Sequence, residues 1–361
     1  MNELDIFVNK LLQLSGASSV GELDIETQRL IIKEINEFLF CSYEGIGETT
    51  VDGITDDYFS DYHKYWSSHY SEILGLEINE QQCEIVADIL HDIYLASGSK
   101  AFTDLDGRYT SFPDIPPEEI CRIRFLTANQ DFGVSLKFKD MIAQYRLERR
   151  TFDCEFMYNN PGVFLDKLGI NKKSQTDKRS AYVQNVAKYV TDLHCTPYEI
   201  INHYDGDVLA FKKDLTTGAG KGAGYGSKKT NMFIRDMYVS GIWKDISNFD
   251  KIDVASDVNT IKIALRTGIL KTKIPLVSSF LDMFSYQYSS VDLNNERAWR
   301  RVWEIWTKKY PDECIVSPSL IDFFIYEVIG KQFCKTRPRH ILYSRAGAFY
   351  GASAESVDRT N

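Results

Sequence analysis

The chain lacks the residue patterns that mark secreted, metal-binding and membrane proteins. Its seven cysteines are scattered without a Cys-x-x-Cys pair, which indicates neither a disulfide framework nor a zinc or iron–sulfur site. Its six histidines form no HExxH or HxxxH pair, so we expect no metal and no cofactor. No stretch approaches the roughly 20 apolar residues of a membrane span, and the first residues lack the order of a signal peptide. We expect a soluble cytoplasmic protein.

Basic residues are scarce in the first hundred positions. Residues 1–100 carry 19 Asp and Glu against 5 Lys and Arg, a net charge of −14, whereas the other 261 residues carry 32 acids and 37 bases, a net charge of +5. A polyanion would be repelled by the first region and attracted by the second. We therefore expect any surface that binds nucleic acid to lie after residue 100.

Apolar residues recur at helical spacing along most of the chain, which predicts an all-α fold. Three such stripes are expected to be buried: Ile85, Ile89 and Ile93; Val183, Val186, Ala187 and Val190; and Trp299, Trp303 and Trp306. The segment TSFPDIPPEE (110–119) is the best candidate linker because its prolines interrupt helices. We predict an acidic helical N-terminal region (1–115), a helical core (116–275) and C-terminal helices that complete that core (276–361).

A glycine-rich run, LTTGAGKGAGYGSKKTN, resembles a phosphate-binding loop. It is not a P-loop, because Leu215 and Gly222 stand where GxxxxGK[ST] requires glycine and Ser or Thr. It is not a dinucleotide fingerprint either, since Ala223, Tyr225 or Ser227 stands at the last glycine position of each possible GxGxxG. Apolar residues at helical spacing flank the run, so the pattern predicts a helix, a glycine turn and a second helix.

The predicted turn suits a nucleic-acid backbone. Gly224 and Gly226 allow the main chain to approach a phosphate, and the first amides of the second helix point toward it. Ser227 is the expected cap of that helix. Such contacts bind the backbone without reading the bases.

The stretch GYGSKKTN resembles the hairpin of the helix-hairpin-helix DNA glycosylases, whose usual form is GVGxKxA. Lys228 falls on the lysine that acts as nucleophile in the bifunctional members. That family has an aspartate at the start of a later helix, and SDVNTIKIALRTG places Asp257 there, with Asn259 and Lys262 following. The 29-residue gap between Lys228 and Asp257 is longer than is common in the family.

A third match lies upstream, where RFLTANQDF (124–132) is similar to the family's LLSAQxTD segment. Asn129, with Gln130 as second choice, aligns with the residue that fills the space left by a flipped base. The resemblance covers roughly residues 120–275. It implies a core of two helical subdomains with the active site between them, and DNA contacts from Gly222, Gly224, Gly226, Ser227, Lys229, Asn129 and Gln130.

The function that the resemblance implies is cleavage of the N-glycosidic bond of a modified base in double-stranded DNA. A carboxylate such as Asp257 stabilises the positive charge that develops on the sugar. If Lys228 attacks the sugar, a Schiff base and strand cleavage follow; if water attacks, an abasic site remains. Asp253 competes for the carboxylate role, because KIDV also resembles a family motif, and Asp257 alone is also a common helix cap.

The form GYGSKKTNMFIRDM and the long N-terminal addition are similar to a phage- and defence-associated branch of these glycosylases. That branch includes the glutamyl/putrescinyl-thymine group and a bacteriophage-restricting enzyme that excises a glucosylated pyrimidine. The resemblance implies a bulky target base and a role in anti-phage defence. Two alternatives stay open: a non-catalytic helix-hairpin-helix DNA-binding protein, and an enzyme acting on modified deoxynucleotides.

The acidic N-terminal region has two possible places. Repulsion from phosphates favours the face opposite Lys228, with plain packing of its apolar stripes. Alternatively, its aromatic loop (43–70) overhangs the base pocket, where Tyr62, Tyr65 and Trp66 would contact a sugar attached to the base.

Overall fold

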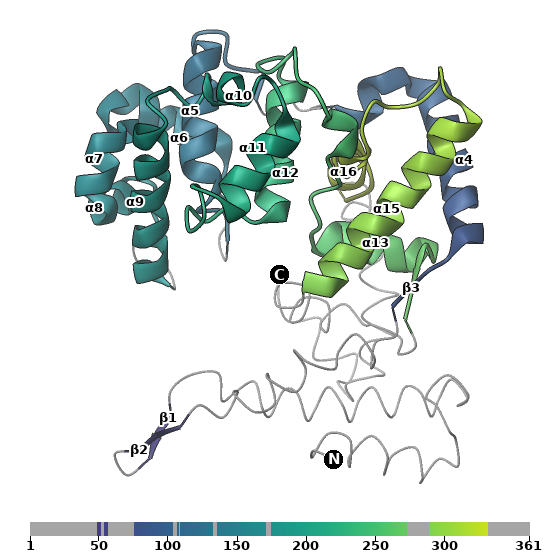
Figure 1. Cartoon of the computed structure of the whole chain (residues 1–361), viewed down its shortest axis with the longest axis horizontal. Coiled ribbons are helices and arrows are strands. Elements are labelled where there is room, and N and C mark those ends of the chain that lie inside the picture. Colours follow the sequence, from purple (N-terminus) through teal and green to yellow (C-terminus); the bar gives the residue numbers. More distant parts are fainter. Residues whose placement is uncertain are drawn as a thin grey trace, which may run out of the picture. The chain divides into compact units, whose positions relative to one another are not determined.

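The computed structural model describes residues 49–51, 54–56, 76–103, 107, 109–132, 136–170, 175–272 and 289–330. This part of the chain is mostly helical (Figure 1), as the periodicity predicts. Its α-helices are α4 (Glu80–Ser97), α5 (Pro117–Ala128), α6 (Phe138–Leu147), α7 (Cys154–Asn159), α8 (Pro161–Lys167), α9 (Thr176–Asp192), α10 (Ile200–His203), α11 (Val208–Thr217), α12 (Ser227–Val239), α13 (Val258–Thr267), α15 (Ser289–Lys309) and α16 (Ile321–Phe323). No helix in these ranges is both long and apolar enough to cross a membrane.

Short elements complete the described part. Single turns of 3₁₀-helix form η2 (Gly98–Phe102), η3 (Arg149–Phe152), η4 (Phe249–Lys251) and η5 (Pro318–Leu320), and η6 (Phe324–Gly330) is a π-helix. The strands form two antiparallel pairs: β1 (Thr49–Val51) with β2 (Ile54–Asp56), and β3 (Glu77–Ile78) with β4 (Leu270–Lys271).

The chain divides into two compact units. Unit 1 comprises residues 1–83, 257–298 and 329–361, and unit 2 comprises residues 84–256 and 299–328. The proline-rich segment 110–119 lies inside unit 2, where Ile115 is buried and Pro117 begins α5. The boundaries expected after residues 115 and 275 stay predictions. The N-terminal aromatic loop (43–70) lies, apart from β1 and β2, outside the described residues.

Unit 2 is built around an aromatic core between α5, α11 and α12. Phe233 on α12 packs edge-on against Trp243 at 5.2 Å and against Phe125 of α5 at 5.1 Å, while Phe211 of α11 meets Trp243 at 5.4 Å between ring centroids. Helices α11 and α12 pack against each other (Figure 1). The core therefore fixes the two helices on either side of the glycine turn.

The predicted helical stripes have different outcomes. The valines and alanine of α9 are buried, which confirms the stripe at Val183 to Val190. The stripe on α4 is a wrong prediction, because Ile85 is 44% exposed and Ile89 is 50% exposed. The buried face of α4 instead carries Val86 and Leu90. Helical spacing shows that residues share a face but not which apolar face turns inward, and this helix has two.

The tryptophans of α15 form a packed face, as predicted. Trp299 and Trp306 are buried, and Trp303 is half-buried. The indole nitrogens of Trp303 and Trp306 donate to the carbonyls of Ile315 and Glu313, at 2.8 and 3.0 Å. These bonds satisfy the polar edge of each ring, so the face serves packing within the fold.

Candidate functional site

The glycine turn joins α11 to α12. Gly222 and Gly224 have φ angles of +94° and +82°, which a residue with a Cβ adopts only with strain. Space adds a second requirement at Gly224: a Cβ there would lie 2.6 Å from Cδ2 of Tyr182. The backbone of the turn therefore has its observed path only because these positions are glycine.

Ser227 does not cap α12, contrary to the sequence prediction. Gly226 is the N-cap residue, with extended backbone angles (φ −103°, ψ −176°), and Ser227 is the first residue of the helix. The extended conformation is the one that an N-cap residue adopts, and glycine is among the residues found there. Both residues are exposed, so the start of α12 is open to solvent.

Asn129 and Gln130 are buried in this structure, and the expectation that one of them fills the space left by a flipped base stays a prediction. Both side chains are fully buried. The Asn129 amide donates to the carbonyls of Ala223, at 2.9 Å, and Tyr182, at 3.1 Å. The Gln130 amide donates to the carbonyl of Arg179 at 3.2 Å. These residues tie the end of α5 to the glycine turn and to α9.

Tyr225 provides a second attachment of the turn to α5. Its ring is buried and stacks on Phe125 with 5.2 Å between centroids, and its hydroxyl donates to the Phe125 carbonyl. The aromatic side chain stands where the family pattern has a small apolar residue. The turn is thus held against α5 from both sides of Gly224.

Lys229 folds back onto the end of α5. Its ammonium donates to the Asn129 carbonyl at 2.7 Å and lies 4.7 Å from the centre of the Phe132 ring. Burial lowers the pKa of Lys229 to about 7, and the charges of Lys228 and Arg179 add to this shift against the attraction of Asp131. A substantial fraction of the amine is therefore neutral near pH 7, unlike a lysine with an ordinary pKa.

Arg179 of α9 lies close to Lys229 and is a buried charge. It is fully buried, donates to the carbonyls of Gln130 (2.9 Å) and Phe132, and lies 3.9 Å from the Phe132 ring centre. The guanidinium therefore fixes the chain that follows α5. The apolar spacing of α9 gives no signal of this, because charged residues usually face water.

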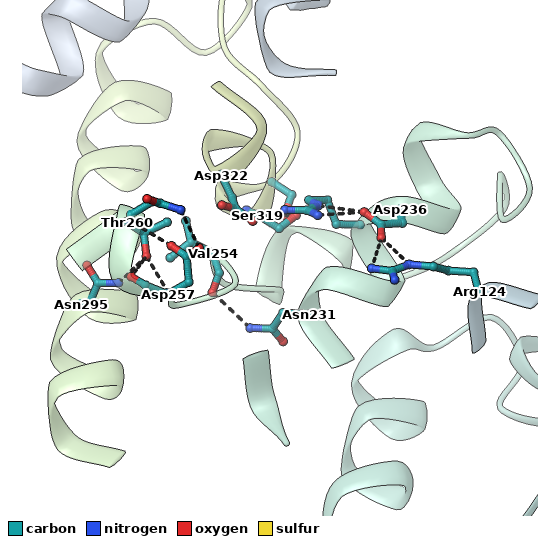
Figure 2. Close-up of polar contacts among 12 residues, drawn as sticks. Arg124, Asn231, Asp236, Val254, Asp257, Thr260, Asn295, Ser319 and Asp322 are labelled. Carbon is teal, nitrogen blue, oxygen red and sulfur yellow. Dashed lines mark hydrogen bonds and ion pairs between the residues drawn. The ribbon is translucent and has the colours of Figure 1, made fainter. Parts of the chain in front are cut away.

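Asp257 is the N-cap of α13, in unit 1. Its side chain accepts from the amide of Thr260 at 2.8 Å, and its own amide donates to the Thr260 hydroxyl at 2.9 Å, a complete capping box. Asn259 donates to the second carboxylate oxygen at 3.1 Å. Asn295 of α15 donates to the same Thr260 hydroxyl at 3.0 Å, as Figure 2 shows. The carboxylate is half-buried and held in one orientation.

Asp253, the competing carboxylate, is paired with a cation. Arg300 lies 2.5 Å from its side chain and also donates to the carbonyl of Asp250 at 3.1 Å. A carboxylate that neutralises a neighbouring guanidinium is less suited to stabilise charge on a substrate. This contact favours Asp257 over Asp253.

The predicted residues fall in different units. Lys228, Lys229, Asn129 and the turn glycines belong to unit 2, and Asp257 begins a segment of unit 1. Asn231 of α12 donates to the carbonyl of Val254, three residues before Asp257, at 3.4 Å. The convergence of Lys228 and Asp257 on one cleft stays a prediction.

A buried charge network behind the turn was not predicted. Arg124 of α5 bonds Asp236 of α12 at 2.9 Å (Figure 2). Arg235 bonds the other Asp236 oxygen at 2.8 Å and also pairs with Asp322 of α16. Burial opposes the charge on Asp236, but the two arginines more than offset it and its pKa is lowered. The pair Arg235-Asp236 therefore joins three helices.

The described ranges contain no group of three or more His, Cys, Asp or Glu placed to hold a metal ion. Comparison with known proteins found no matching family model and no matching curated protein.

Proposed function

We propose that this protein is a helix-hairpin-helix DNA glycosylase that removes a modified base from double-stranded DNA. The observation that carries the proposal is the glycine turn, whose backbone leads to the exposed start of α12, where Lys228 follows. Amides at a helix N-terminus suit a phosphate oxygen, and the glycines remove the side chains that would keep the backbone away. The arrangement of the core in two helical subdomains is part of the same proposal.

Asp257 supplies the carboxylate of the proposed reaction. Cleavage of an N-glycosidic bond places positive charge on the sugar, and a fixed anion beside it lowers the barrier. The Thr260 amide and the Asn259 side chain hold the carboxylate in place. The base must leave the duplex before reaction, at a cost that is smallest for altered or poorly paired bases. A hypermodified or glucosylated pyrimidine is the proposed target, which would place the protein in anti-phage defence.

The test is release of free base from duplex DNA. Wild-type protein is incubated with one of three duplexes, which carry glucosylated hydroxymethylcytosine, a hypermodified thymine or only unmodified bases. The released base is separated from the DNA and identified by mass spectrometry. Asp257→Asn should reduce the rate of release by at least about a hundredfold, if the charge supplies the roughly 2.7–4 kcal/mol typical of such groups. Asparagine keeps the helix cap, so folding and DNA binding should persist. Asp250→Asn is the matched control, since the side chain of Asp250 is 43% exposed and pairs with its neighbour Lys251.

The alternative function is a DNA-binding module without catalysis. The hydrogen bonds that the Asp257 carboxylate receives account for the residue as a helix cap alone, and this observation favours the alternative. Equal, negligible base release from all three DNAs, together with salt-dependent duplex binding, would decide for the module. Activity on free modified deoxynucleotides would instead support the other alternative, an enzyme that acts on modified deoxynucleotides.

A further inference from the structure

An amide side chain, that of Asn295, lies on the apolar face of α15. It is fully buried, and the same face carries Val291, Ala298 and Trp299, which are buried as well. A buried amide costs free energy unless it forms hydrogen bonds, whereas a leucine fills similar space without that cost. The side-chain nitrogen of Asn295 donates to the Thr260 hydroxyl at 3.0 Å, as Figure 2 shows. This bond is therefore what an asparagine adds at this position.

The bond from Asn295 fixes the direction of the Thr260 hydroxyl. A hydroxyl has one hydrogen to donate and two lone pairs that accept. The Thr260 oxygen accepts from the Asp257 amide at 2.9 Å and from Asn295 at 3.0 Å, and its hydrogen goes to the Asp257 carbonyl at 2.9 Å. The buried hydroxyl therefore cannot rotate without breaking one of these bonds. It holds the backbone of Asp257 on both sides and is itself held from α15.

A helix cap alone does not need this contact with α15. The capping box of α13 is complete within residues 257–260, because Asp257 accepts from the Thr260 amide and the Thr260 hydroxyl accepts from the Asp257 amide. The bond from Asn295 adds a fixed relation between this box and a helix 35 residues further along the chain. Buried polar contacts of this kind select one arrangement of the chain at some cost in stability.

We propose that Asn295 is a positioning residue that orients the Asp257 carboxylate through the Thr260 hydroxyl. The inference rests on the proposed glycosylase function, in which Asp257 stabilises positive charge on the sugar. Such stabilisation depends on where the anion is held before the reaction begins, because a group that must first be oriented contributes less. Asn295 acts on the orientation of Asp257 and not on the substrate. Its loss should therefore slow base release without weakening the binding of DNA.

The experiment is a double-mutant cycle in the full-length protein. Asn295→Leu removes the donor, Thr260→Val removes the hydroxyl and keeps the shape, and a third protein carries both changes. For each protein, kcat and KM of base release are measured on the modified duplex that wild type cleaves. We expect kcat to fall about tenfold or more in each single variant, since a misplaced group loses much of its effect. KM should stay within about twofold, because binding is not affected.

The double variant should be no slower than Thr260→Val, because Asn295 has no hydroxyl left through which to act. Two independent losses would instead multiply in the rate. This comparison separates positioning through Thr260 from simple filling of space by Asn295. If Asn295→Leu fails to fold, Asn295→Ala takes its place in the same cycle, and circular dichroism checks that each variant is folded at the assay temperature.

Thr151→Val is the control for lost stability. Thr151 is another fully buried threonine, in unit 2, whose hydroxyl accepts from Gln144 and donates to Glu148, both at 3.3 Å. This variant should lose stability and keep the wild-type kcat. An unchanged kcat in the Asn295 variant, multiplying losses in the double variant, or an equal fall of kcat in Thr151→Val would each overturn the positioning role.

The same measurements distinguish the two proposals. Base release by wild type together with an unchanged kcat in the Asn295 variant rejects only the role of Asn295. No base release by wild type from any of the three duplexes rejects the proposed function, and the positioning role with it.

Discussion

The side-chain nitrogen of Asn129 and the carbonyl oxygen of Ala223 lie 2.9 Å apart, although 94 residues separate them in the chain. This bond holds the glycine turn against the end of α5. Since both partners are buried, replacing Asn129 with alanine leaves the carbonyl without its donor. The hydrogen bond therefore predicts a role for Asn129 in the stability of the fold.

Asn129→Ala should lower the free energy of unfolding by about 1–3 kcal/mol, the cost of leaving a buried polar group unpaired. Urea unfolding followed by circular dichroism measures it. Gln184→Ala is the matched control, because Gln184 is an amide that donates to the Tyr158 carbonyl at an exposed site, and it should change stability by less than about 0.5 kcal/mol. Unchanged stability in Asn129→Ala, with loss of base release, would support the base-replacing role for this residue.

Gly224→Ala should destabilise the protein by about 1–3 kcal/mol through backbone strain, with the clash against Tyr182 adding to this. Thermal unfolding by calorimetry checks it. Gly162 in α8 is the control, since a Cβ there meets nothing within 4 Å and its φ is negative. Gly162→Ala should be neutral or slightly stabilising, because alanine favours helix. Similar losses in both variants would mean that the turn tolerates the added methyl group.

Asp236→Asn should cost about 3–5 kcal/mol, since it leaves Arg124 and Arg235 buried without their shared carboxylate. The acid sensitivity of stability should change as well. The pKa of Asp236 is lowered in the folded state from its ordinary 3.8, so its contribution is complete above that value and is lost as pH falls through the folded pKa. Urea titrations between pH 3 and 7 should therefore show a smaller loss below pH 4 in the variant. A parallel pH dependence in both proteins would contradict this.

Lys229→Met should gain stability relative to wild type at low pH. The pKa of Lys229 falls to about 7 on folding from 10.5, so the unfolded chain binds more protons between these values and wild-type stability rises with pH across that window. The penalty of the buried charge is complete below pH 7 and disappears as pH approaches 10.5. The free energy of unfolding of the variant should thus exceed that of wild type most at pH 6, and this advantage should shrink toward pH 10. Lys221→Met, at an exposed site, should show no such trend.

Much of the fold follows from periodicity. The helices on both sides of the glycine turn are where the apolar spacing of Val208, Phe211 and Leu215, and later of Phe233 and Met237, predicts them, and these side chains are buried. The position of Asp257 at a helix start was equally readable, because an aspartate before an amphipathic stretch is a strong cap signal.

The orientation of polar side chains was not readable. Asn129, Gln130 and Arg179 look like surface residues because their types usually are, yet each is buried against backbone carbonyls contributed by distant segments. Local pattern has no access to such partners. The lowered pKa of Lys229 depends on the same kind of long-range contact, so no sequence motif reveals it.

The ion pair between Arg235 and Asp322 can form only late in synthesis of the chain on the ribosome. Unit 2 is assembled from two separate stretches, 84–256 and 299–328, and Asp322 is the last member of the buried charge network to be made. Until it emerges, Arg235 has only one of its carboxylate partners, and the surface that Leu320, Ile321 and Phe323 later cover is open to water. A nascent chain, or one truncated before residue 320, would therefore hold an incomplete core in the state that chaperones and proteases recognise.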